Sequence, residues 1–133
     1  MRFFSDTNLT VGVSLPPGSN GFSPMSDRNV KENFKPVDPR VVLEKVSRLP
    51  VTEWNLISQP ASIRHIGPMA QDFQAAFGVG EDDRHISTTD ADGVALAAIQ
   101  GLNEVLKEKE ARIEKLEKDV ADLKAMVDSL LKK

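Results

Sequence analysis

Residues 99–133 have the sequence IQGLNEVLKEKEARIEKLEKDVADLKAMVDSLLKK, the most regular stretch of the chain. Apolar residues recur in it with the seven-residue period of helices that wind around one another. Position a of this heptad holds Ile99, Leu106, Ile113, Val120 and Val127, and position d holds Leu102, Lys109, Leu116, Leu123 and Leu130. Since nine of these ten positions are apolar, the stretch predicts one long coiled-coil helix. The alternative is a long helix folded back on its own head.

The charged residues beside this repeat indicate how the helices run. Arg112 at position g would face Glu117 at position e of a parallel neighbour, and Asp119 would face Lys124 in the same way. Such pairs suit a parallel coiled coil. β-branched residues at position a with leucine at position d favour a coiled coil of two helices, whereas Lys109 interrupts the d layer. The heptads alone therefore leave the number of chains open.

Composition excludes several classes of protein. The net charge is −3 and no basic patch with interleaved aromatic residues is present, which argues against nucleic-acid binding. Cysteine is absent, so disulfides and cysteine-ligated metals are excluded. No signal-like pattern follows Met1, and no apolar run approaches the about 18 residues of a membrane helix, so we expect no membrane partner.

The first 25 residues combine strand-like and linker-like sequence. LTVGVSL, residues 9–15, alternates apolar with small or polar residues, which is typical of a half-buried strand. This strand is predicted to pair with the RFF run of residues 2–4 across a turn at SDTN, residues 5–8. Residues 16–24, PPGSNGFSP, have the composition of a linker. Because an isolated hairpin is marginal in water, we expect these strands to pair with neighbouring chains.

The head that lies between the linker and the tail carries signals for both helices and strands. Asp38 followed by Pro39 is typical of the N-cap and first residue of a helix, which Pro50 would stop. VTEWNLIS and SIRHIG, residues 51–58 and 62–67, predict two short strands. A head of this size is small for independent stability, which points toward self-association.

The remaining head signals complete the predicted fold. A second short helix is expected to open at Pro68 and to end at Gly78, and Trp54 is expected in the core or in an interface. The polar connection that follows is expected to hold at most one short strand, and Asp90 or Asp92 is expected to cap the tail helix. Together the elements predict an α+β fold: short N-terminal strands, a small mixed head with a small sheet, and a long C-terminal helix in a parallel coiled coil.

Metal sites are not supported by the residue spacing. His65 and His85 lie in different segments without the ligand spacing of a zinc site. TTDADG resembles part of a calcium loop, but alignment on Gly93 places Thr88 at the first ligand position and Ile99 at the twelfth, where a bidentate glutamate is needed. We therefore expect neither a metal nor another cofactor.

SPMSDRNVKENF, residues 23–34, places a serine five positions before a lysine. Ser26 is either the N-cap of a surface helix or a nucleophile whose proton Lys31 removes. On a straight helix, residues five apart point about 140° away from each other. A functional pair therefore requires Ser26 to lie outside the helix and Lys31 to fold back toward it. Spacing alone favours the N-cap.

A series of motifs in one order extends well beyond that pair. These are SDRNVKENFKPVD, VLEKVSRLPVTEWN, IRHIGPMAQDF and TTDADGVALAAIQGLNEVL. In this order they resemble the intramolecular chaperone domain of endosialidase-type phage tail spikes, the S74 peptidase family found at the C-termini of tail fibres and related bacterial surface proteins. The resemblance runs from Ser26 to about Leu106, and the coiled coil that follows also fits the family.

The resemblance implies a self-cleaving serine endopeptidase that acts once. The cut would fall at the Met25–Ser26 bond, with Ser26 as the nucleophile and Lys31 as its base. A lysine can take this proton if burial or a neighbouring positive charge lowers its pKa toward neutrality.

The resemblance also implies partners and a domain organisation. The chain would form a homotrimer, template the folding of its own upstream β-rich fibre, and then release itself. Residues 1–25 would be the end of that fibre with its linker, residues 26–97 the chaperone head, and residues 98–133 the coiled-coil helix. The setting would be tail-fibre or virion assembly of a phage or prophage in the host cytoplasm, or a bacterial cell surface.

Two other functions remain open on the sequence. One is a trimerisation module without cleavage, which a Ser26→Ala change would leave with an unaltered gel pattern. The other is a receptor-binding tip retained on the fibre, which would require an exposed apolar or aromatic patch on the head. Aromatic residues make up 5% of the chain and mostly occupy predicted core positions, so the receptor-binding tip ranks last of the three functions.

Overall fold

A computed structural model describes residues 1–4, 8 and 11–133 of the chain. These residues form two compact units, Met1–Pro36 and Val37–Lys133. The predicted α+β class is confirmed: short strands come first, a two-stranded sheet follows in the head, and a long helix ends the chain. Residues 5–7 of the predicted turn and residues 9–10 of the predicted strand lie outside the described residues.

The first unit contains a three-stranded antiparallel sheet in the order β1-β2-β3. β1 (Arg2–Phe4) pairs with β2 (Gly12–Ser14), so the predicted pairing of the RFF run is confirmed within the chain. β3 (Ser23–Pro24) pairs with β2 and comes from the segment predicted to be a linker. Proline cannot donate to a strand ladder, and it stands here on an edge strand, where it is tolerated. Pairing with other chains stays a prediction.

The second unit begins with the helix that the Asp38-Pro39 pair predicted. α1 (Pro39–Arg48) is capped by Asp38, whose side chain accepts hydrogen bonds from the backbone N–H groups of Arg40 at 2.9 Å and Val41 at 3.3 Å. Such a bond satisfies backbone donors that have no partner in the first turn of a helix. The local capping signal was therefore sufficient to locate this helix.

The two predicted head strands also form, each shorter than its predicted segment. β4 (Thr52–Trp54) pairs antiparallel with β5 (His65–Gly67), and Trp54 lies opposite His65 with the ring centroids 4.8 Å apart. Trp54 is half-buried, and its indole nitrogen Nε1 is buried without a hydrogen-bond partner.

The second helix, α2 (Ala70–Phe77), begins two residues after Pro68 and ends at Gly78 as predicted. Gly78 has a φ of 64° in the left-handed region, which glycine adopts without the steric cost that a Cβ brings. The Phe73 side chain is buried and lies against Phe77, with ring centroids 4.9 Å apart.

The long helix, α3 (Thr88–Leu131), begins earlier than the heptad pattern indicated. Its N-cap is Ser87, whose hydroxyl oxygen accepts a hydrogen bond from the backbone N–H of Thr89 at 3.2 Å. The prediction that Asp90 or Asp92 caps this helix is therefore wrong. Asp90 lies in the first turn instead, where a carboxylate is favourable beside the positive end of the helix dipole. Residues 78–87 form bends and irregular chain, without the one short strand that this connection was expected to hold.

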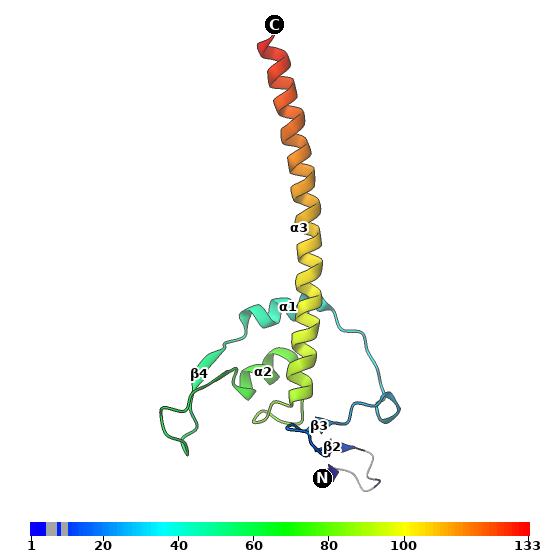
Figure 1. Cartoon of the computed structure of the whole chain (residues 1–133), viewed down its shortest axis with the longest axis vertical. Coiled ribbons are helices and arrows are strands. Elements are labelled where there is room, and N and C mark those ends of the chain that lie inside the picture. The colour runs from blue at the N-terminus through cyan, green and yellow to red at the C-terminus, as the bar shows by residue number, and fades with distance from the viewer. Residues whose placement is uncertain (5–7, 9–10) are drawn as a thin grey trace. The chain divides into compact units, whose positions relative to one another are not determined.

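α1 packs across the N-terminal part of α3, and the rest of α3 extends beyond the head as one continuous helix (Figure 1). Gly101 is buried at this contact, and an ion pair of 2.7 Å joins Arg40 of α1 to Glu108 one heptad later. None of the nine apolar a and d residues is covered: their side chains are 48% to 67% exposed. The single chain thus leaves an apolar stripe along α3 without a partner.

We predict that Gly101→Val destabilises the second unit. A Cβ at Gly101 would collide with the backbone carbonyl of Pro39, which cannot rotate away. Overpacking of this kind typically costs about 1–3 kcal/mol. The matched control is Gly93→Ala in the same helix, where a Cβ meets nothing within 4 Å and should add about 1 kcal/mol of stability. Urea unfolding at one fixed chain concentration measures both, and equal midpoints for the two variants would contradict the prediction.

Among the residues that the structure describes, no helix is long and apolar enough to cross a membrane.

Candidate functional site

The structure brings Ser26 and Lys31 together. The Lys31 ammonium nitrogen Nζ donates a hydrogen bond to Ser26 Oγ at 2.7 Å. Ser26 lies outside the helical turn, in the segment between β3 and the turn, and Lys31 lies just beyond the other end of the turn. This is the arrangement that a five-residue spacing requires, since the two residues would not share a face of one straight helix.

The turn between them is a single 3₁₀ turn, η1 (Arg28–Val30). Its N-cap is Asp27, which has extended backbone angles and whose carboxylate accepts a hydrogen bond from the Asn29 N–H at 2.9 Å. The interpretation of Ser26 as the N-cap is therefore wrong. Because the next residue takes the capping role, the Ser26 hydroxyl remains available to Lys31.

The bond between Met25 and Ser26 is held on both sides. On one side the Met25 N–H donates to the Gly12 carbonyl oxygen at 2.8 Å, which continues the pairing of β3 with β2. On the other side Asp27 fixes the start of the η1 turn. The peptide bond that precedes Ser26 is thus the junction between a sheet and a turn.

Both members of the pair are exposed in the single chain, as are all residues from 16 to 38. A serine hydroxyl beside an amine can act as a nucleophile when the amine is neutral and takes the hydroxyl proton. A lysine in water keeps its proton at neutral pH, and burial disfavours its charged form. The geometry for proton transfer is present here, whereas the single chain does not exclude water from it.

The predicted coiled-coil residues all lie on α3. Their apolar side chains form the exposed stripe described above, and Lys109 stands among them at position d. Gly101 and Glu108, which contact α1, occupy another side of the helix. The head therefore covers one side of α3 and leaves the predicted coiled-coil face open.

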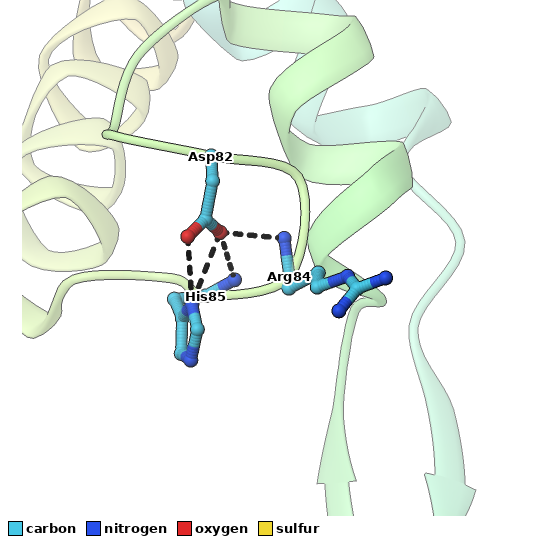
Figure 2. A network of polar contacts seen from close by, with 3 residues as sticks. All are labelled: Asp82, Arg84 and His85. Atoms are coloured by element: carbon cyan, nitrogen blue, oxygen red, sulfur yellow. Dashed lines mark hydrogen bonds and ion pairs between the residues drawn. The ribbon is translucent and has the colours of Figure 1, made fainter.

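The loop between α2 and α3 is organised by Asp82 (Figure 2). Its Oδ1 accepts hydrogen bonds from the backbone N–H groups of Arg84 at 2.7 Å and His85 at 2.9 Å, and the ring nitrogen Nδ1 of His85 lies 2.9 Å from Oδ2. The Arg84 N–H first, and then the His85 ring, hold the pKa of the Asp82 carboxyl below its ordinary value of 3.8. Within the described residues, no group of three or more His, Cys, Asp or Glu side chains is placed to hold a metal ion.

This lowered pKa predicts that the loop loosens in acid. A carboxyl whose folded-state pKa is depressed contributes stability above its unfolded-state pKa, and that contribution is lost as the pH falls through the lower, folded value. We expect the Asp82 carboxyl to titrate below 3.8 by NMR, with the Arg84 amide losing exchange protection over the same range. Asp82→Asn keeps the acceptor but cannot titrate, so its loop should stay protected. An Asp82 midpoint at or above 3.8 would contradict the assignment.

Two parts of the site were not singled out from the sequence. One is Asp27 as the cap of the η1 turn, although an aspartate directly before a short polar segment is an ordinary N-cap signal. The other is the bond from Met25 to Gly12, which joins residues far apart in the chain. No local pattern specifies a contact of that kind.

Comparison with known families covers the head of the chain. Residues 26–79 match the family model of Peptidase S74, which is described as the chaperone of endosialidase. The resemblance recognised from the sequence motifs is confirmed for these residues, which run from Ser26 through α1 and the hairpin to the end of α2. No curated protein matches the chain.

Proposed function

We propose, from the premise that residues 26–79 belong to the chaperone-of-endosialidase family, that this chain is a trimeric intramolecular chaperone that releases itself by autoproteolysis. It would template the folding of a β-rich fibre that precedes it and then cut the Met25–Ser26 bond. Ser26 is the nucleophile and Lys31 is its base. The observation that carries this proposal is the 2.7 Å contact between Lys31 Nζ and Ser26 Oγ.

The chemistry balances with the groups of the chain and one water molecule. Neutral Lys31 takes the proton of Ser26 Oγ, and the oxygen attacks the carbonyl carbon of Met25. The C–N bond to Ser26 breaks, the Ser26 nitrogen receives the proton from Lys31, and Met25 is left as an ester on Oγ. Water then hydrolyses the ester, which yields the Met25 carboxylate and restores the Ser26 hydroxyl. Because nucleophile and carbonyl belong to adjacent residues, proximity lowers the barrier.

Anchoring of the scissile bond supports the same reaction. The Met25 N–H is bonded to Gly12 in the sheet, and Asp27 caps the turn on the other side. The backbone on either side of the Met25 carbonyl is therefore fixed only when the sheet and the turn are both formed. In this scheme, cleavage responds to the folded state of the preceding strands.

The exposed face of α3 supports assembly through a parallel coiled coil. Nine apolar side chains at heptad positions are about half exposed in one chain, and burying an aliphatic side chain contributes about 1.5–3 kcal/mol when complete. A bundle of three such helices would cover this face while leaving the side that holds α1 free. Because each β-rich segment continues into its own head, a bundle of three chains would bring three such segments into one assembly, as a template requires.

Assembly would also make Lys31 an effective base. A lysine exposed to water is a poor base at neutral pH, and burial favours its neutral form. In the proposed trimer, neighbouring chains cover the site and exclude water from it. Cleavage thus follows assembly and does not precede it.

The direct test is the intact mass of the chain expressed with further upstream sequence. The wild-type chain is expected to yield a fragment that begins at Ser26, whereas Ser26→Ala is expected to remain whole. If Ser26→Ala gave the same gel pattern as wild type, cleavage through this serine would be excluded. The chain would then be interpreted as a trimerisation module. The matched control is Ser23→Ala, which changes a nearby serine in β3 and should leave cleavage intact.

A further inference from the structure

We propose that Asp27 is a positioning residue for self-cleavage: it orders the η1 turn that carries Lys31 onto Ser26. This inference rests on the proposed function and adds to it a residue that the serine–lysine pair does not include. The hydrogen bonds of the Asp27 side chain reach neither the scissile bond nor the Lys31 amine; both go to Asn29, inside the turn.

Two hydrogen bonds of equal length join Asp27 to Asn29. Asp27 Oδ1 accepts from the Asn29 backbone N–H at 2.9 Å and from the Asn29 side-chain Nδ2 at 2.9 Å. The backbone bonds of the same turn are longer, at 3.3 Å from the Val30 N–H to the Asp27 carbonyl and 3.2 Å from the Lys31 N–H to the Arg28 carbonyl. The side chain of Asp27 therefore supplies the shortest hydrogen bonds within the turn.

The turn has little else to hold it. A single 3₁₀ turn has poorer hydrogen-bond geometry than an α-helix and does not persist without support. All residues from 26 to 36 are exposed, so packing against a core does not order this segment. If the cap is lost, Lys31 leaves Ser26, because their five-residue separation brings the side chains together only while the turn is folded.

The cleavage rate should then follow the population of the turn. Loss of an N-cap side chain typically reduces the population of the structure that it caps by a factor of about 2 to 30. We expect Asp27→Ala to slow cleavage by about that factor. Asp27→Asn keeps an oxygen that accepts from the Asn29 N–H, so it should restore most of the rate. Asn29→Ala retains the backbone N–H and loses one of the two hydrogen bonds. Its cleavage rate should therefore lie between those of Asp27→Ala and Asp27→Asn.

The experiment measures cleavage rates of the chain with upstream sequence attached, as a function of pH. For Asp27→Ala we expect a lower plateau, an unchanged midpoint of the pH–rate profile, and an unchanged unfolding temperature for the trimer. Glu32→Ala is the matched control, since it removes a carboxylate beside Lys31 without touching the bonds to Asn29. Wild-type rates in Asp27→Ala, or an Asp27→Asn variant as slow as Asp27→Ala, would overturn the inference.

A second measurement separates this inference from the proposed function. If wild type fails to cleave, or if Ser26→Ala cleaves, the proposed function is wrong. The turn can still be examined in the Ser26→Ala chain by exchange of the Asn29 backbone amide. That amide should be protected with Asp27 present and should exchange faster by about the same factor in Ser26→Ala/Asp27→Ala. Equal exchange rates in the two chains would exclude Asp27 as the residue that orders the turn.

Discussion

Replacing Lys31 by arginine is expected to stop cleavage at the Met25–Ser26 bond, as replacing it by alanine should. Arginine keeps the positive charge and can still donate to Ser26 Oγ, but a guanidinium with a pKa above about 12 cannot take the hydroxyl proton. Loss of a general base typically costs about 10²–10⁴-fold in rate. The measurement is the fraction of chain cleaved over time, by intact mass, for wild type, Lys31→Arg and Lys31→Ala.

The control for this prediction is Lys35→Arg, four residues further along the same exposed segment. Its cleavage rate should equal that of wild type. All Lys31 variants should remain trimers, since the residue lies outside the tail helix. Cleavage of Lys31→Ala at the wild-type rate would remove this lysine from the mechanism and leave Ser26 with another base.

Placing a charge in the middle of the coiled-coil face is expected to convert the proposed trimer into monomers. Val120→Asp would bury a carboxylate in each of three chains at one layer, and burying a charge without a partner costs several kcal/mol per ion. The measurement is sedimentation equilibrium at micromolar concentration in the uncleavable Ser26→Ala chain. The mass measured for the parent should be three times the 14.6 kDa of one chain. The mass measured for the Val120→Asp variant should be that of a single chain.

Ala125→Asp supplies the matched control for that change. It introduces the same residue into the same helix, but at the outward heptad position f, where the carboxylate stays in water. It should leave the trimer intact. A parent chain that sediments as a monomer or as a clean dimer would defeat the proposed trimer, and a Val120→Asp chain that remains trimeric would exclude this face as the interface.

Local signals account for most of the elements that were predicted correctly. Asp38 and Pro39 specify the start of α1, and Gly78 specifies the end of α2, because caps act through hydrogen bonds and backbone angles within a few residues. The start of α3 was placed too late because Asp90 or Asp92 was expected to be its cap, and aspartate and serine are both ordinary N-cap residues. The heptad pattern that reveals the coiled coil becomes regular only at Ile99, whereas the helix begins after its cap at Ser87.

Pairing between distant segments was harder to predict from the sequence. β3 was predicted to be linker because its composition is that of a loop, and it becomes a strand only because β2 offers an edge to pair with. The sequence suggested Ser26 and Lys31 through a resemblance of motifs, whereas spacing alone favoured Ser26 as a cap. The 2.7 Å contact depends on the next residue, Asp27, taking the capping role.

The periodicity of residues 99–133 and the caps of the head helices required no tertiary information, because each depends on neighbours a few positions away in the chain. The place where α1 crosses α3, in contrast, could be found only from the tertiary structure. That contact joins Arg40 to Glu108, 68 residues apart, and depends on Gly101 lacking a side chain where the Pro39 carbonyl approaches. From the sequence alone, a glycine within a helical repeat indicates only a less stable helix. The packing of the second helix against it shows why a residue without a Cβ is needed at this position.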